Sequence, residues 1–219
     1  MDMRAILAGL AFALIWSSAF TSARIIVTDA PPILALSLRF LISGMVGIAI
    51  ARMLGQTWRL TPAQWKATIV FGICQNALYL GMNFVAMQSI EASLASIIAS
   101  TMPLAVGFAG WVILGERLSW VGILGLFAGA LGVALIMGAR MQEGVDLFGI
   151  VLCFIAVASL TVATLMVRGA SSGGNLLMII GLQMLVGSAL LAIPGLLLEH
   201  KVVVWSSKLI MAFSYTVLM

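Results

Sequence analysis

Arg39 is the residue best placed to do chemistry, because it is a charge inside an otherwise apolar stretch. It follows Pro32 by seven positions, which is about 10 Å along a helix that rises about 1.5 Å per residue. An arginine at that depth in a bilayer is costly and usually faces a cavity or a partner. We interpret Arg39 as the contact for an anionic group of a solute, such as a carboxylate. The alternative is that Arg39 extends to the membrane surface or bonds backbone carbonyls.

A group of polar side chains marks the third apolar stretch. Gln75, Tyr79 and Asn83 recur at intervals of four, and Asn76 lies beside them, so a helix would carry them on one face. Such a stripe in lipid turns inward, either to bond neighbouring helices or to line a wet pathway. We favour the pathway, with Asn76, Tyr79 and Asn83 as hydrogen-bonding groups for the solute. Trp16, near the middle of the first apolar stretch, could form an apolar wall of the site or be a large core residue.

The sequence lacks the residues that common enzyme chemistries need. It has no phosphate-binding P-loop, no HExxH and no GxSxG motif, and its single histidine, His200, lies in a loop. Cys74 and Cys153 fall within apolar stretches without ligand-spaced partners, so we interpret them as small apolar fillers. The sequence therefore predicts no enzyme, no catalytic residue, no metal site and no cofactor. The scattered basic residues also argue against nucleic acid as a partner, since proteins that bind it cluster them on one face.

The composition assigns the chain to the membrane. Of its 219 residues, 63% are hydrophobic and 8% are charged, whereas ordinary soluble proteins are about 25% charged. Apolar stretches long enough to cross about 30 Å of hydrocarbon cover almost the whole chain, and only helices can span with such sequences. We predict an all-α polytopic bundle with seven spans and the start of an eighth, at 5–27, 33–54, 64–87, 92–114, 119–138, 147–168, 176–198 and from 207 onward.

Local signals indicate several helix ends and contacts. Thr61 opens a predicted capping box, and Ser119 is expected to cap the fifth span. Pro103 interrupts the fourth span and predicts a bend there, which is either a static kink or a gating hinge. Gly125 and Gly129 recur at helical spacing in the fifth span and predict close helix packing.

The distribution of Lys and Arg predicts the orientation of the spans. With the N-terminus in the cytoplasm, more basic residues lie on the cytoplasmic side than on the opposite side, as membrane proteins require. The cytoplasmic set is Arg4, Arg52, Arg59, Lys66, Arg117 and Arg168, and the opposite set is Arg24, Arg140, Lys201 and Lys208. We therefore expect a multi-pass protein of the inner (plasma) membrane with a cytoplasmic N-terminus.

An internal repeat is the second organising feature of the chain. A shift of 144 residues overlays the first two spans on the sixth and seventh without a gap, and it places Arg39 on Gln183. We therefore count Gln183 among the solute-binding residues. A unit of five helices is odd in number, so the second unit would insert upside down, as in many transporters. We predict a first repeat at 1–139 and an incomplete second repeat at 147–219, from a truncated form of a ten-helix protein.

Three groups of residues resemble the EamA-type members of the drug/metabolite transporter superfamily. They are Trp16-Ser17-Ser18-Ala19-Phe20, Leu38-Arg39-Phe40-Leu41, and the ordered set Ala92-Ser93-Leu94-Ala95-Ser96, Met102-Pro103-Leu104 and Leu114-Gly115-Glu116-Arg117-Leu118. The resemblance implies two inverted five-helix repeats, cytoplasmic termini and export of small metabolites such as amino acids by alternating access. It also places Glu116 and Arg117 in a turn on the cytoplasmic side, which a charge pair between them would fix.

The function we expect is transport of a small metabolite, amino-acid-like or related, through a site between the two repeats near mid-membrane. Its partners would be the solute and the lipid bilayer, with a homodimer among the assemblies left open. No carboxylate lies at mid-membrane for a proton relay, so facilitated diffusion, exchange and proton coupling all stay open. The competing interpretations are a packing subunit or fragment without transport activity, and an intramembrane enzyme that modifies lipids.

Overall fold

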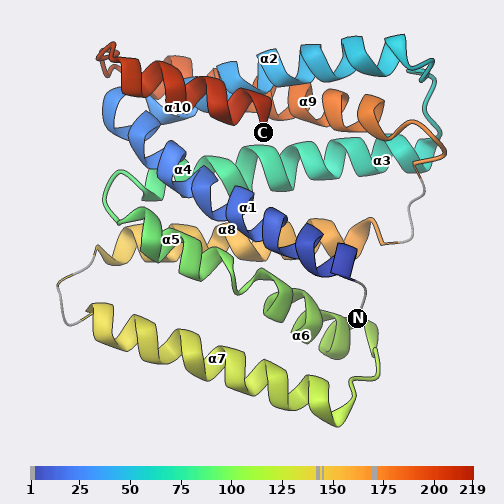
Figure 1. Ribbon diagram of the computed structural model, residues 1–219, viewed down its shortest axis with the longest axis vertical. Helices are drawn as coiled ribbons and strands as arrows, with labels where there is room; N and C mark the ends of the chain where they lie inside the picture. Colours follow the sequence, from blue (N-terminus) through green and yellow to red (C-terminus); the bar gives the residue numbers. More distant parts are fainter. Residues whose placement is uncertain (1–2, 142–143, 145, 169–171) are drawn as a thin grey trace.

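The computed structural model describes residues 3–141, 144, 146–168 and 172–219, and these form a bundle of helices without a strand (Figure 1). The helices are α1 (Met3–Asp29), α2 (Pro32–Met53), α3 (Pro62–Phe71), η1 (Gly72–Leu80), α4 (Gly81–Ala86), α5 (Ala92–Ala99), α6 (Met102–Leu114), α7 (Trp120–Met141), α8 (Leu147–Met166), α9 (Leu176–Leu198) and α10 (Ser207–Leu218). The predicted all-α bundle is confirmed.

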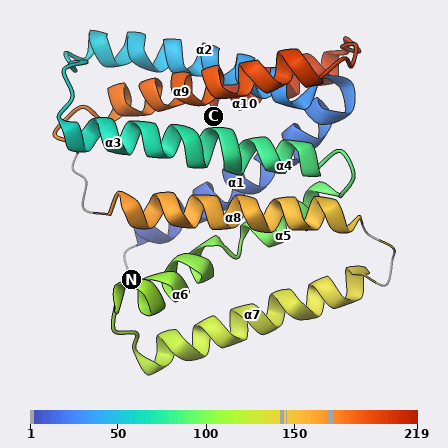
Figure 2. The ribbon, with the colours of Figure 1, turned by 180° about the vertical axis from the view of Figure 1, so that it is seen from behind.

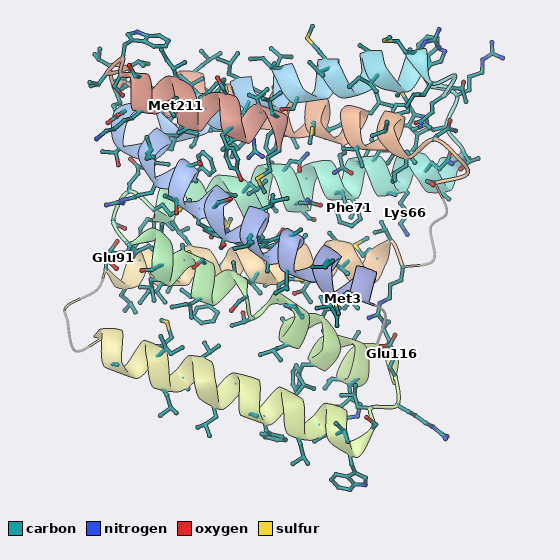
Figure 3. The ribbon with its side chains drawn as sticks, viewed as in Figure 1. Met3, Lys66, Phe71, Glu91, Glu116 and Met211 are labelled. Atoms are coloured by element: carbon teal, nitrogen blue, oxygen red, sulfur yellow. The ribbon has the colours of Figure 1, made fainter. Side chains whose placement is uncertain are left out.

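The described residues include seven helices that are long and apolar enough to cross a membrane, followed by α10 as a shorter apolar helix. The chain is therefore a multi-pass membrane protein. The helices run along a common direction, so the turns collect at two ends of the bundle (Figure 1). Glu91 lies at one end and Lys66 and Glu116 lie at the other (Figure 3). We call these ends the Glu91 rim and the Lys66 rim.

The third span is a composite helix rather than a regular α-helix. Thr61 begins it with the predicted capping box: its hydroxyl accepts from Gln64 N at 3.3 Å, and Gln64 Oε1 accepts from Thr61 N at 2.9 Å. From Gly72 to Leu80 the backbone is a π-helix, a rare form that is frequent at functional sites. Its wider turn changes which residues share a face, so the predicted polar stripe is divided between two neighbouring helices.

The fourth span is broken near its middle. α5 ends at Ala99, and α6 begins at Met102 with Pro103 in its first turn. A proline is tolerated there because the amide that it lacks has no partner within the helix. The interruption predicted from Pro103 is therefore present, as a break before the proline instead of a kink around it. Thr101 and Ser100 connect the two halves through turn hydrogen bonds.

α2 and α9 form the most extensive helix pair and lie side by side when the bundle is seen from front and back (Figures 1 and 2). Two glycines permit this approach, because a Cβ on Gly44 would lie 2.9 Å from Gly181 O and one on Gly181 would lie 3.0 Å from Gly44 O. η1 contacts both α9 and α8, and α1 crosses the bundle beside α10 and α5. The α2–α9 pair thus forms one wall of the core.

α7 lies at the edge of the bundle, and only 6% of its most apolar stretch, within Trp120–Ala139, is buried inside the protein. A Cβ on Gly129 would lie 2.7 Å from Leu104 Cδ1, so this glycine packs closely against α6. Around Gly125, by contrast, the described part of the chain has nothing within 4 Å of such a Cβ. Among the described residues, Gly129 thus has a close neighbour on another helix and Gly125 has none. Glycines at helical spacing indicate a helix face that another helix could approach closely, but they do not indicate whether a helix lies there.

Candidate functional site

Arg39 borders a small cavity between α1, α2, the η1–α4 segment and α10. Its lining includes Phe20, Ala23, Arg39, Asn83, Met87 and Thr216. The cavity has a volume of about 40 Å³, far below the roughly 300–1,000 Å³ of typical small-molecule sites. In this arrangement a solute would have to move helices apart to enter.

The Arg39 guanidinium is only partly satisfied within the bundle. Its Nε donates to Thr216 O at 2.7 Å, and its central carbon lies 5.5 Å from the centre of the Phe40 ring. Arg39 thus bonds a backbone carbonyl, which was part of the alternative to solute binding given for this residue. The two terminal nitrogens, however, make no hydrogen bond to the described residues. These nitrogens form the fork that matches a carboxylate or phosphate in bidentate geometry.

Asn83 lines the same cavity, but its amide is bonded within the bundle. Its Nδ2 donates to Tyr79 O at 2.7 Å, and its Oδ1 accepts from Cys153 Sγ at 3.5 Å. Only 2% of the residue is exposed. Asn83 therefore sets the polarity of the cavity wall and joins α4 to α8, and Cys153 has a polar contact that the interpretation as an apolar filler did not include.

Asn76 and Gln183 meet away from the Arg39 cavity. Asn76 Nδ2 donates to the backbone oxygen of Gln183 at 2.9 Å, and a Cβ on Gly187 would lie 2.4 Å from Asn76 Cβ. Asn76 therefore joins η1 to α9, whereas Asn83 faces α8. The single polar stripe was a wrong prediction, because it assumed α-helical spacing through a segment that is a π-helix.

Tyr79 and Trp16 pack together in a separate cluster that also contains Leu160 of α8. Tyr79 is 4% exposed, and its hydroxyl has no hydrogen-bond partner in the described structure. An unsatisfied buried group of this kind costs about 1–3 kcal/mol. Phe20 packs against this cluster and also lines the Arg39 cavity, so the two regions are neighbours.

The sequence suggested a charge pair between Glu116 and Arg117. In the structure Glu116 pairs instead with Arg168, which follows α8. Glu116 folds back over α6 because Gly110 has no side chain; a Cβ there would lie 2.7 Å from Glu116 Oε2. Arg117 is exposed. The ion pair therefore joins two spans at the Lys66 rim (Figure 3), a long-range contact that neighbouring sequence positions could not reveal.

Two residues of the α9–α10 loop were missed by the sequence reasoning. The Glu199 carboxylate accepts from Ile33 N and Leu34 N, both at 2.8 Å, at the start of α2. Lys201 Nζ donates to two of the last carbonyls of α1, at 2.6 and 2.8 Å. α2 has no acidic residue in its first turn and α1 no basic residue in its last. The loop therefore places a negative charge at the N-terminus of α2 and a positive charge at the C-terminus of α1, as the two helix dipoles favour.

Comparisons with known proteins agree with this architecture. The model of the EamA-like transporter family matches residues 3–138. Uncharacterized transporter YvbV of Bacillus subtilis (strain 168) is 26% identical over 203 residues, which are 92% of this chain and 66% of that protein. Uncharacterized transporter YoaV of the same organism is 25% identical over 153 residues, 68% of this chain and 52% of that protein. The chain thus spans less than two thirds of the length of these relatives.

A solved structure with 22% sequence identity superposes on the bundle with a TM-score of 0.66, over 99% of this chain and 78% of that one. At this identity the likeness supports the fold alone.

Proposed function

This chain belongs to the EamA-like transporter family, and from that premise we propose that it moves a small anionic or amphipathic metabolite across the membrane. Amino acids and related acids are the solutes that suit the site. The observation that carries the proposal is the Arg39 guanidinium, which borders a cavity between four spans and keeps two terminal nitrogens without a partner among the described residues. A cation in that position, inside an apolar bundle, favours a solute with a carboxylate.

Each site residue has a proposed role. Arg39 forms a bidentate contact with the anionic group. Phe20 supplies an apolar wall, and Asn83 contributes polarity to the cavity. Tyr79 and Trp16 act when the helices separate, because the Tyr79 hydroxyl is then free to bond a solute and Trp16 extends the apolar surface. Asn76, which lies elsewhere, joins η1 to α9 through the backbone oxygen of Gln183.

Alternating access would supply the space that the cavity of about 40 Å³ lacks. We propose that two oppositely inserted repeats rock against each other around the Arg39 cavity. The break between α5 and α6 and the π-helix η1 are irregular backbone segments, and we propose that the movement takes place at them. We also propose that the protein lies in the inner membrane with its N-terminus in the cytoplasm, and that transport is outward.

The test is flux through proteoliposomes that contain the full chain. Wild-type protein should take up at least one member of a panel of radiolabelled amino acids and other small carboxylates. Arg39→Gln should abolish that flux without loss of folding, and Arg39→Lys should retain part of it, since a lysine keeps the charge without the fork. Arg52→Gln, which removes an exposed cation at the end of α2, is the matched control and should transport normally.

Unchanged flux in Arg39→Gln would contradict the proposed role of Arg39. Absence of flux for every member of the panel, in well-folded wild-type protein, would favour a packing subunit without transport activity.

A further inference from the structure

Another cavity of the bundle shares two lining positions with the Arg39 cavity under the 144-residue shift. Arg39 and Ala23 line the first cavity, and Gln183 and Val167, each 144 positions later, line the second. The second cavity lies between α3, the turn after α8, and α9, and its volume is about 180 Å³. Phe71 lines it from α3 and lies on the same side of that helix as Lys66 (Figure 3).

A pair of helix positions also recurs under the shift. Arg39 Nε donates to Thr216 O beside the first cavity. Gln183 O would lie 3.0 Å from a Cβ on Gly72, and Gly72 precedes Thr216 by 144 positions. The two positions therefore meet twice in the bundle, once through the Arg39 side chain and once through the Gln183 backbone.

The second cavity differs from the first in its chemistry. No charged residue lines it among the described residues, and its polar side chains are Gln64, Ser172 and Gln183. Gln64 is occupied, since its Nε2 donates to Ser172 O at 2.6 Å and its Oε1 accepts from Thr61 N. The side-chain amide of Gln183 makes no hydrogen bond to the part of the chain that is described. It therefore offers one acceptor and two donors beside apolar walls.

We propose that the Gln183 cavity is a second solute site, which binds an uncharged amide or hydroxyl group attached to an apolar portion of the solute. The inference rests on the proposed function, because it gives the solute a second place along its path. A carboxylate would lose its hydration in this cavity without a cation to replace it, which is costly. A neutral hydrogen-bonding group would satisfy the Gln183 amide at little cost, and Phe71, Ile179 and Ile180 would cover an adjoining aliphatic or aromatic portion.

The position of the cavity gives it a role in access. Gln64 lies in the first turn of α3 and Ser172 lies in the turn between α8 and α9, so the Gln183 cavity is near the Lys66 rim. Met87 and Ala23 place the Arg39 cavity toward the other end of the spans. The solute would therefore bind first through its uncharged part near the Lys66 rim and afterwards through its carboxylate at Arg39.

The test uses the purified full chain in nanodiscs and N-acetyl-leucinamide, a neutral probe with two amides and an aliphatic side chain. Saturation-transfer NMR at millimolar probe measures its binding. Gln183→Met keeps the length of the side chain and removes its amide, so the signal should fall about fivefold, the effect of one lost hydrogen bond. Ala67→Leu, which fills the cavity from α3, should also reduce it. Gln88→Met, at an exposed position on the Glu91 rim, is the matched control and should bind like wild type.

Arg39→Gln separates this inference from the proposed function. It should leave binding of the neutral probe intact while it abolishes carboxylate flux. If Arg39→Gln transports normally but Gln183→Met loses the probe, the second site stands and the proposed function fails. Absence of probe binding to wild type, or equal binding by wild type, Gln183→Met and Ala67→Leu, would overturn the second site.

Discussion

Ser37 and Ser188 exchange hydrogen bonds across the contact between α2 and α9. Ser37 Oγ donates to Ser188 O at 2.9 Å, and Ser188 Oγ donates to Ser37 O at 2.8 Å. The 144-residue shift converts this pair into Gly181 and Gly44, which make the close backbone approach in the same contact. A symmetric crossing of α2 with α9 is what two inverted repeats would produce at their boundary, so these pairs support that proposal.

The serine pair should stabilise the bundle by a measurable amount. We expect Ser37→Ala and Ser188→Ala each to destabilise the bundle by about 0.6 kcal/mol, and by no more than about 1.7 kcal/mol, as for other hydrogen bonds between membrane helices. Each variant loses one donated bond but keeps the backbone oxygen that accepts from the other serine. The free energy of unfolding in mixed detergent measures these losses. Ser214→Ala, at an exposed position of α10, is the control, and losses no larger than its own would show that the pair contributes nothing.

An added methyl group should lower the stability of the bundle at Gly187 in α9 but not at Gly125 in α7. Gly187→Ala would push a Cβ to 2.4 Å from Asn76 Cβ, and overpacking of this kind costs about 1–3 kcal/mol. Gly125→Ala adds a Cβ with no described atom within 4 Å and should be neutral or stabilising by up to about 1 kcal/mol, because alanine favours the helix. Thermal unfolding in one detergent compares the two variants. A similar loss in both would contradict the packing described for α7.

Glu199 should protect the first amides of α2 from hydrogen exchange. Glu199→Ala removes the acceptor for Ile33 N and Leu34 N, and loss of such a helix cap costs about 1 kcal/mol. Exchange at these two amides should therefore become about fivefold faster. His200→Ala changes the exposed neighbour and should leave exchange unaltered. Unchanged protection in Glu199→Ala would mean that the carboxylate does not hold the start of α2.

Asp146 should make the start of α8 sensitive to acid. A hydrogen bond from Ser89 lowers the pKa of Asp146, and bonds from the backbone amides of Phe148 and Gly149 lower it further, while desolvation opposes them. Because the pKa of Asp146 is lower in the folded protein, its ionised carboxylate stabilises the fold at pH values above its unfolded-state pKa of about 3.9. This stabilisation is lost as the pH falls through the folded-state pKa.

Asp146→Asn tests this dependence, because asparagine also caps a helix but does not titrate in this range. The melting temperature of the wild type should fall more steeply with acidification than that of Asp146→Asn, and both should melt alike near neutrality. Parallel pH profiles would contradict the role of Asp146.

The positions of the spans could be predicted because lipid leaves the backbone few choices. Each apolar stretch had to become a helix, and Thr61 marked the start of the third span through bonds to its own neighbours. The break beside Pro103 was predictable for the same reason, since a proline disturbs the helix locally.

The arrangement of the candidate site could not be predicted, because it depends on contacts far apart in the sequence. The π-helix at η1 accompanies the packing of Asn76 against Gly187, and nothing in the spacing of its residues indicated it. The separation of Arg39 from Gln183 into two cavities, and the pairing of Glu116 with Arg168, likewise require the packed bundle.

Opposite insertion of the two repeats is tested most directly by cysteine labelling at two equivalent loop positions. Trp58 and Val202 are 144 residues apart and are 67% and 81% exposed. Each would be replaced by cysteine in a protein whose Cys74 and Cys153 have become alanine. A membrane-impermeant maleimide applied to intact cells should label position 202 at once and position 58 only after permeabilisation. Labelling of both positions from the same side would contradict the inverted repeats and the site proposed between them.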